Sequence, residues 1–485
     1  MFTRIRIHNL VKLLLVFSLA TPSLTMAVEQ LELATVLHRI NNTYPSLKIA
    51  VKQVEKSRQD ALSVESQLSW NMSVQGGLTH DLGGFNTITD TVNLGLNFSR
   101  QLESGSSLSV GTNISNMDTD DSTITAGLAS IIADPQQALD FDLSYRMPLG
   151  KGDGNPAYQL ALANSQTGLL MAKANKSLAY DRLANQVIEF YFATAQVQAQ
   201  RTSAQKALKR AEKQVEFTRK NKRLGLAEER EVLQVTAQLR ATRMELANAN
   251  RLWFKQRTAL NRLMGMPWDN EFELRFANGK LPENDYKYVY KDIETYNPTL
   301  KLNRAQKMMA EAAIDSAQND RENQFDIIAS LGSKSRSGDF PASSYNETGA
   351  TYSLRFEYQL PMDKRGFDAR LYQARIDKDI AEDNIRLVQD DIRYNLLSLL
   401  AEINVSKDSL KQSKSRLAIE RQRHNEVRQR YERGRADTRQ MIMAEGELAF
   451  GELSMQQQKI ELAKRQAQLQ VMRGTFWNGI SGNKE

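Results

Sequence analysis

The chain has 485 residues, a formal net charge of +7 from 64 Lys and Arg against 57 Asp and Glu, and no cysteine. The absence of cysteine excludes disulfides, thiolate metal sites and a lipid anchor on an N-terminal cysteine. The net charge is modest for this length, so no nucleic-acid partner is implied.

The first segment predicts export. Basic residues precede the short apolar run 13–17, which leads to small residues ending at Ala27. This arrangement is typical of a secretory signal peptide over residues 1–27, cleaved after Ala27. No later apolar stretch reaches the length of about 20 residues that crosses a bilayer as a helix. If the mature chain spans a membrane, we therefore expect a β-barrel.

Alternation of apolar and polar residues predicts strands in two regions, about 69–148 and about 325–360. The expected strands lie near 69–79, 90–101, 106–115, 138–147, 325–333 and 351–360, with Gly- and Asp-rich loops at 80–84, 116–121 and 333–346. Alternation alone fits a lipid-facing barrel wall and a soluble β-sandwich equally well. Six strands cannot enclose a useful channel, so a barrel requires several chains.

Two long helical patterns follow the strand regions, at about 155–222 and 365–432, and the one proline in either is Pro156, at the start of the first. About 65 helical residues extend on the order of 100 Å, which is too long for an ordinary globular core. Gly225 and Gly434 end these patterns, since glycine tolerates the left-handed conformation that closes a helix. Each region therefore predicts a pair of antiparallel helices with a glycine at the turn.

The two helix pairs match each other in sequence. Gly225 and Gly434 lie 209 positions apart, and the same offset aligns Gly265 with Gly474. Apolar residues then recur every seven positions, which predicts helices that supercoil against a partner. The two series are Val232, Leu239, Leu246, Trp253 and Leu260, and Met441, Leu448, Met455, Leu462 and Leu469. The sequence thus predicts a duplication, with repeats at 28–268 and 285–477, a linker at 269–284 and a tail at 478–485.

The sequence contains no group of residues with the spacing of a known catalytic site. His38, His80 and His424 are the histidines that follow the signal segment, and none has ligand spacing or a neighbouring nucleophile. No Gly-rich phosphate loop with a following lysine occurs. We expect no catalytic residue, no cofactor and no bound metal, and hence a protein that is not an enzyme.

The turn segments 225–233 and 434–442 share the pattern G-x-[AS]-x-x-x-[DEQ]-[VM]-[LI], and the stretch Met147-Pro-Leu-Gly-Lys-Gly closes the first strand region. Together with the signal peptide and the repeat, these segments resemble the TolC-type outer membrane efflux protein family. The resemblance implies an α+β membrane protein: a homotrimer whose strands form one shared outer-membrane β-barrel and whose helices form a long periplasmic coiled-coil barrel.

The same resemblance implies a function and its partners. Such a protein is a passive exit channel in the outer membrane, surrounded by outer-membrane lipid. It serves tripartite efflux or type I secretion, and it docks a periplasmic adaptor (membrane fusion) protein attached to an inner-membrane pump or ABC exporter. The alternative is a periplasmic coiled-coil scaffold without a pore, against which the alternating strands argue. The transported cargo is not readable from the sequence.

The resemblance also implies two groups of site residues. The adaptor-docking tips correspond to Arg223, Leu224, Gly225, Leu226 and Ala227, and to Arg433, Gly434, Arg435 and Ala436. The periplasmic gate corresponds to Glu231, Tyr431, Gln440 and Met443. Tyr431 matches a tyrosine that forms a polar link, with Glu231 as an acidic partner. Gln440 and Met443 occupy positions that are acidic in some members, so an acidic ring is not expected here.

Two further features stand apart from the family pattern. The segment 201–223 is strongly basic, which fits a solvated helix end favoured by the helix dipole, or else an entrance that tolerates anions. The first strand region carries an extra hairpin near 91–115, and the sequence does not say whether this hairpin joins the barrel wall.

Overall fold

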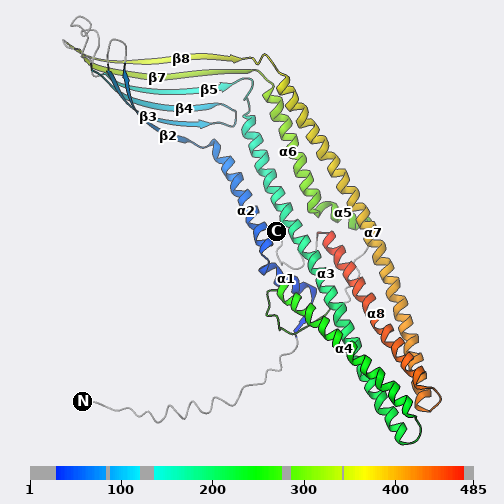
Figure 1. Cartoon of the computed structure of the whole chain (residues 1–485). Coiled ribbons are helices and arrows are strands. Elements are labelled where there is room, and N and C mark those ends of the chain that lie inside the picture. Colours follow the sequence, from blue (N-terminus) through cyan, green and yellow to red (C-terminus); the bar gives the residue numbers. More distant parts are fainter. Residues whose placement is uncertain (1–28, 83–87, 121–135, 276–285, 341–342, 475–485) are drawn as a thin grey trace, which may run out of the picture.

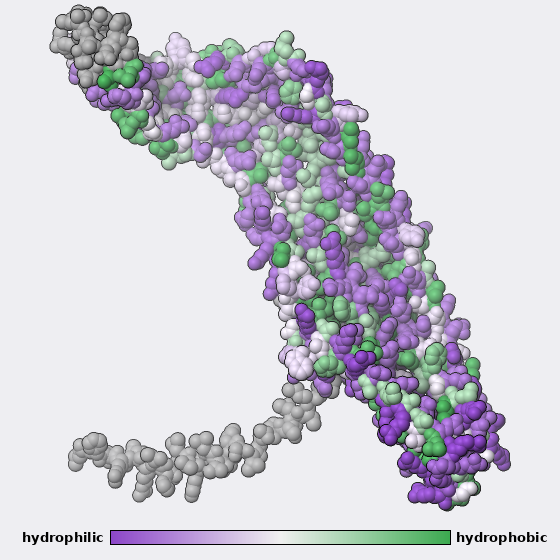
Figure 2. All heavy atoms as spheres, viewed as in Figure 1, coloured by the Kyte–Doolittle hydropathy of each residue, from purple (hydrophilic) through white to green (hydrophobic). Residues whose placement is uncertain are grey.

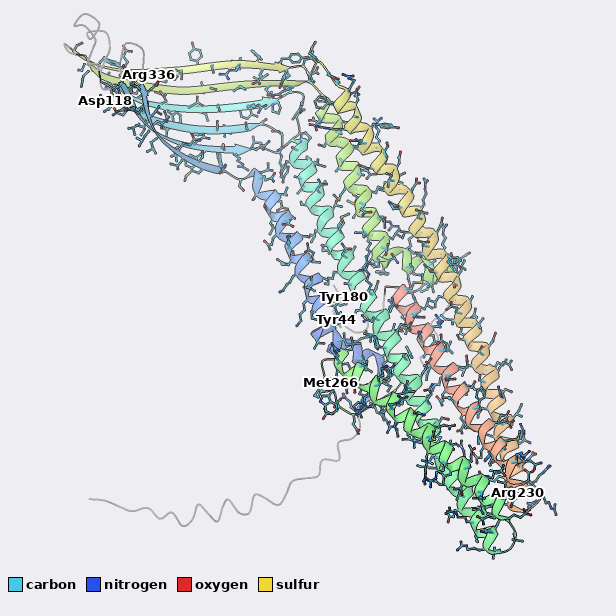
Figure 3. The ribbon with its side chains drawn as sticks, in the orientation of Figure 1. Tyr44, Asp118, Tyr180, Arg230, Met266 and Arg336 are labelled. Carbon is cyan, nitrogen blue, oxygen red and sulfur yellow. The ribbon has the colours of Figure 1, made fainter. Side chains whose placement is uncertain are left out.

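The computed structural model describes residues 29–82, 88–120, 136–275, 286–340 and 343–474. The predicted signal peptide 1–27, the tail 478–485 and most of the linker 269–284 lie outside the described residues. Figure 1 shows a sheet at one end of an elongated bundle of helices, whose far end consists of two helical hairpins. In Figure 3, Asp118 and Arg336 mark the outer end of the sheet and Arg230 marks the hairpin end.

Six antiparallel strands form the sheet, in the order β2-β3-β4-β5-β7-β8. Their bounds are β2 Asn71–Leu82, β3 Ile88–Gln101, β4 Ser107–Asp120, β5 Gln136–Pro148, β7 Gln324–Phe340 and β8 Ser343–Gln359. The extra hairpin near 91–115 is β3 and β4, and each of its strands pairs on both sides. This hairpin is therefore part of the continuous sheet.

The predicted loops at 80–84, 116–121 and 333–346 are wrong over most of their described length, because the strands continue through them. Ser337 pairs with Asn346, for example, well inside the segment expected to be a loop. Polar residues occupy both faces of these outer strand ends, so hydropathy does not alternate there. The ladder of backbone hydrogen bonds continues regardless of hydropathy, and the strands are longer than the apolar pattern indicates.

The register places apolar side chains on one face of the sheet and polar side chains on the other. Leu94 pairs with Ile114 in the adjacent strand, and Leu331 pairs with Tyr352. Asn113 and Asp140 pair on the opposite face. The large apolar side chains are exposed: Met72, Val74, Leu78, Val92, Leu94, Phe98, Ile114, Leu139, Phe141, Tyr145, Leu331, Tyr352, Leu354, Phe356 and Tyr358.

The helices form a layer that continues from the sheet. Their bounds are α1 Leu33–Thr43, α2 Pro45–Glu65, α3 Pro156–Arg223, α4 Glu229–Leu263, α5 Tyr286–Tyr296, α6 Pro298–Asp320, α7 Arg365–Glu432 and α8 Thr438–Met472. Near the sheet the packing order is α2-α3-α6-α7, and near the hairpin end it is α4-α3-α8-α7. α3 and α7 have 68 residues each, and α4 and α8 have 35 each. No described helix combines the length and the low polarity that a transmembrane helix needs.

Helix boundaries follow the local sequence. Proline occupies the first position of α2, α3 and α6, where its missing N–H costs nothing. Asn155 precedes α3 in the left-handed conformation, with φ of 50°, and its side chain accepts a hydrogen bond from the Tyr158 N–H.

The main core lies midway along the helices, around the middle of α3. Short parallel strands β1 (Glu29–Leu31) and β6 (Phe272–Leu274) pack there with α1 and the end of α4. Tyr191 of α3 is fully buried, and its hydroxyl donates to the carbonyl of Arg275 (2.7 Å) and lies 3.1 Å from the carbonyl of Leu31. Burial raises the pKa of Tyr191 above its usual value. This tyrosine ties both short strands to the long helix.

Asp181, on α3 two residues before the core residue Leu183, gives the helical region a pH dependence. Burial raises the pKa of this carboxyl to about 6, against about 4 in the unfolded chain. The folded state therefore holds the extra proton, so stability is highest below pH about 4 and falls as pH rises through about 6. We expect Asp181→Asn to stabilise the protein at pH 7 by about 2 kcal/mol and to flatten the pH profile between pH 4 and 6. Thermal unfolding of both proteins, followed by circular dichroism in detergent, measures this; equal melting temperatures at pH 7 would contradict it.

Candidate functional site

The turns of the two helical hairpins have the same backbone geometry. Gly225 and Gly434 have φ of 75° and 69°, the left-handed region that glycine occupies without strain. In the first turn the Leu226 N–H donates to the Asn221 carbonyl at 2.8 Å, and in the second the Arg435 N–H donates to the Arg430 carbonyl at 2.8 Å. These hydrogen bonds satisfy the last carbonyls of α3 and α7.

The next helix begins in the same way in both hairpins. Glu228 and Glu231 form a capping box at the start of α4, and Asp437 and Gln440 form one at the start of α8. Two of the predicted gate residues, Glu231 and Gln440, are therefore the third helical residue of each box.

The two tips differ in the chemistry that they expose. Leu224 and Leu226 flank Gly225 with exposed fractions of 63% and 74%. Arginines occupy the equivalent places beside Gly434, at positions 433 and 435, and they are also exposed. Hydrophilic side chains otherwise gather over this end of the molecule (Figure 2). The residues that flank the glycine are thus apolar in the first tip and cationic in the second, on the same backbone.

Tyr431 links the two hairpins close to the tips. Its hydroxyl shares a hydrogen bond with the Thr218 hydroxyl of α3 at 2.8 Å and lies 3.4 Å from the Thr438 hydroxyl of α8. Both threonines are 1% exposed, and the tyrosine ring packs against Phe217. Within the chain, Tyr431 therefore meets two threonines rather than Glu231, while Met443 is exposed on α8.

An ion cluster that the sequence patterns above do not predict joins α3 to α7 and α8. Arg210 of α3 lies 2.5 Å from Glu445 and 3.5 Å from Glu452, both of α8. His424 of α7 lies 2.8 Å from Glu445, and Arg421 lies 3.8 Å from Glu452. The two glutamates are seven residues apart and four residues after the heptad positions Met441 and Leu448. That spacing is the signal by which the sequence could have identified them.

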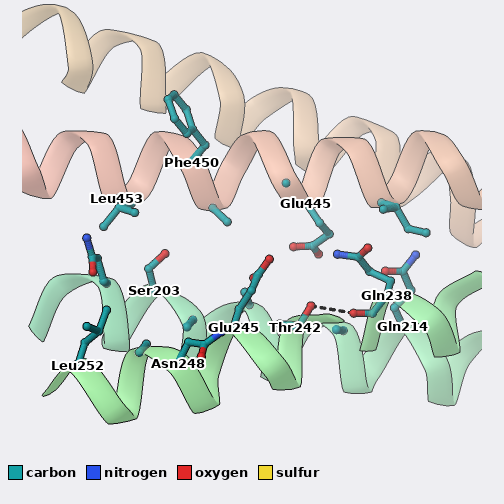
Figure 4. A pocket seen from close by; sticks show the side chains of 18 residues that line it. Ser203, Gln214, Gln238, Thr242, Glu245, Asn248, Leu252, Glu445, Phe450 and Leu453 are labelled. Atoms are coloured by element: carbon teal, nitrogen blue, oxygen red, sulfur yellow. Dashed lines mark hydrogen bonds between the residues drawn. The ribbon is translucent and has the colours of Figure 1, made fainter. Parts of the chain in front are cut away.

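A groove of about 560 Å³ runs beside this cluster. α3 and α4 line one wall and α8 the other, and Gln214, Gln238 and Glu445 face its interior (Figure 4). Small side chains such as Ala207 and Gly446 leave the space open. Among the described residues, no group of three or more potential metal ligands gathers here or elsewhere.

At its helical end the polar face of the sheet carries an ion pair between a buried carboxylate and a half-exposed arginine. Asp326 of β7 is 0% exposed and lies 2.5 Å from Arg146 of β5. The Gln324 side-chain amide donates to the same carboxyl at 2.7 Å. This pair fixes β5 against β7 where the sheet meets the helices.

Neither a family model nor a curated protein sequence matches the chain. Solved structures do match it. A structure of CusC, described for its folding and transmembrane channel formation, has a TM-score of 0.65 at 16% identity and covers 92% of this chain and 93% of that chain. The open MtrE outer membrane channel of Neisseria gonorrhoeae has a TM-score of 0.62 at 17% identity, and the match covers 91% of this chain and 88% of that chain. The outer membrane protein VceC of Vibrio cholerae has a TM-score of 0.55 at 16% identity, and the match covers 91% of this chain and 96% of that chain.

Proposed function

From the fold that the chain shares with TolC-type outer-membrane efflux channels, we propose that this protein is the outer-membrane exit duct of a tripartite efflux system. Three copies form one sheet-walled barrel in the outer membrane and one helical tube in the periplasm. The duct is passive, and an inner-membrane pump drives transport through a periplasmic adaptor. The similarity to efflux channels favours efflux over type I secretion.

The observation that carries the proposal is the exposed apolar face of the sheet. Leu94 and Phe141 are about half exposed, and Tyr352 is 85% exposed. A soluble β-sandwich would cover such a face, and a scaffold without a pore would have no use for it. In a barrel wall, lipid solvates the apolar face and water solvates the polar face, so each face has a suitable environment.

We infer that the chain arose by duplication, with units at 28–268 and 285–477. The equal lengths of α3 and α7, and of α4 and α8, support this inference. So do the two glycine turns and the two capping boxes at a constant offset of 209 positions. Each trimer then presents to its partner six tips with the same backbone geometry, three of each kind.

The two tips are the proposed docking surface for the adaptor. Arg223 to Ala227 form one tip and Arg433 to Ala436 the other, and Leu224 and Leu226 supply its exposed apolar contacts. We expect Leu224→Asp with Leu226→Asp to abolish efflux, because two carboxylates would have to be desolvated on docking. Dye accumulation by cells carrying only this variant measures the loss. Leu224→Met with Leu226→Met keeps the apolar surface and should retain efflux; full efflux by the aspartate variant would exclude this contact.

Tyr431 and Thr218 are the proposed clasp of the periplasmic gate, with Glu231, Gln440 and Met443 beside it. Tyr431→Phe with Thr218→Val removes the 2.8 Å hydrogen bond and keeps the shapes of both side chains. Purified wild-type protein should conduct weakly in planar bilayers, and the double variant should conduct several-fold more.

A protein that stays out of the outer-membrane fraction and forms no conducting channel would favour the scaffold alternative. Clear cation selectivity would exclude an anion-tolerant entrance at the basic tips.

A further inference from the structure

The sheet and the helical layer are open along the same two sides. β2 and β8 are the edge strands of the sheet, and each pairs with one strand only. α2 and α7 are the outer helices of the layer near the sheet. β2 leads from α2 and β8 leads into α7, so one side of the chain is α2 with β2 and the other is α7 with β8 (Figure 1).

Both open sides carry groups that need a partner. The outer edges of β2 and β8 pair with no strand of the described residues, and an open sheet edge does not occur in lipid. On α7, exposed apolar side chains form one continuous stripe: Tyr372, Ile376, Ile380, Leu387, Tyr394 and Val405. Val51 and Leu62 are exposed on one face of α2.

The number of strands allows the two edges to join. All neighbours in the sheet are antiparallel and there are six strands, so β2 and β8 run in opposite directions. The β8 edge of one copy can therefore continue the antiparallel ladder with the β2 edge of the next. The apolar faces also agree, since Val74 of β2 and Phe356 of β8 both lie on the exposed apolar face.

The register within the sheet gives the register of that junction. We call the end of each strand nearest the helices its base. One row of paired residues starts at the base of β2 and consists of Asn71, Ser99, Ser109, Ser144, Ser330 and Ser353. β8 ends at Gln359, six positions beyond Ser353. If all strand bases lie at one level around the ring, Asn71 of the next copy pairs with Gln359. Gln75 then pairs with Arg355.

That stagger corresponds to a tilt that barrels require. Six residues along a strand are about 20 Å, and six strand spacings are about 29 Å, which together give a tilt of about 35°. Closed barrels have tilts of about 35–45°. With this junction the stagger of the ring is therefore that of a closed wall.

The widths of the two layers agree as well. Strands tilted by about 35° each take about 6 Å of circumference, so six strands span about 35 Å. Four helices at spacings of about 8–10 Å span about 32–40 Å. Without β3 and β4, the sheet would span only about 24 Å and would be narrower than the helices below it.

From these observations we propose that three copies close one 18-stranded barrel, in which β8 of each copy pairs with β2 of the next and the β3–β4 hairpin is a full part of the wall. The partner of each open edge is thus a second copy of this chain. This inference rests on the proposed trimeric duct, and it adds the strand number, the junction and its register. A wall of 18 strands has a backbone diameter of about 34 Å, in the range of barrels with an aqueous interior.

Disulfide trapping tests the junction, and the natural absence of cysteine provides a clean background. Gln75→Cys with Arg355→Cys should link neighbouring chains and give a covalent trimer on a denaturing, non-reducing gel. Gln75→Cys with Leu354→Cys places the thiols on opposite faces and should not link. Ser109→Cys with Ser144→Cys, whose hydroxyls lie 2.6 Å apart, should link within one chain and leave a monomer band.

The outcomes separate this inference from the proposed function. A trimer in the outer membrane, detected by lysine-reactive crosslinking, that forms no 75–355 disulfide would overturn the junction and leave the duct intact. A monomer, or a protein absent from the outer membrane, would overturn both. Cryo-electron microscopy of the wild-type ring provides a measurement without variants: a backbone diameter near 34 Å supports 18 strands, and one near 23 Å, as for 12 strands, contradicts them.

Discussion

Replacing Arg210 by methionine is expected to lower the free energy of unfolding of the helical region by about 3 kcal/mol. Arg210 is the cation that α3 places between Glu445 and Glu452 of α8, and all three side chains are about 20% exposed. Methionine would leave two carboxylates side by side in a poorly hydrated contact. His424 and Arg421 would remain as their only partners in the cluster.

Two variants distinguish the loss of charge pairing from the loss of packing. Arg243→Met breaks a pair with Glu212 in which both side chains are about half exposed, and it should cost less than about 1 kcal/mol. Arg210→Met combined with Glu445→Gln and Glu452→Gln removes the uncompensated charges and should recover most of the stability. Denaturant unfolding followed by helical circular dichroism gives all three values. Equal losses for Arg210→Met and Arg243→Met would show that the cluster does not clamp α3 to α8.

The long helices were predictable because their signals are local. Gly225 marks the end of one long helix, and the heptad series mark the faces that pack. The turn at Gly434 followed from its match to Gly225. Such signals depend only on neighbours in sequence, so they can be recognised without knowing the tertiary contacts.

The ends of the strands and the polar contacts between helices were harder to predict from the sequence. Residues 333–337 of β7 are polar on both faces, so hydropathy carries no information about their pairing. Tyr431 is hydrogen-bonded to Thr218, more than 200 residues away in the sequence, and Arg210 forms an ion pair with Glu445 at a similar separation. Neither contact follows from spacing along one helix. The resemblance gave Tyr431 a linking role, but only the packing of α3 against α7 and α8 identifies its partners.

If β3 lies in the wall of the proposed barrel, replacing Leu94 by arginine is expected to destabilise that barrel by about 2–4 kcal/mol, the cost of a guanidinium at mid-depth on a lipid-facing strand. Leu94 lies in the middle of the apolar residues of β3 and is 54% exposed on the apolar face. Urea unfolding in lipid vesicles, or the yield of heat-resistant trimer in the outer membrane, measures the effect. The variant tests β3 in particular, because a hairpin held outside the membrane would tolerate the charge.

Asn93→Arg is the matched control for that variant. It places the same side chain one position away, on the polar face that the proposed barrel turns toward water. Water hydrates the guanidinium there, so its cost should be within about 0.5 kcal/mol of zero. A large difference between the two variants requires lipid on one face of β3 and water on the other, which only a strand within the barrel wall provides. Two equally mild variants would place the β3–β4 hairpin outside the bilayer and return the wall to four strands per chain.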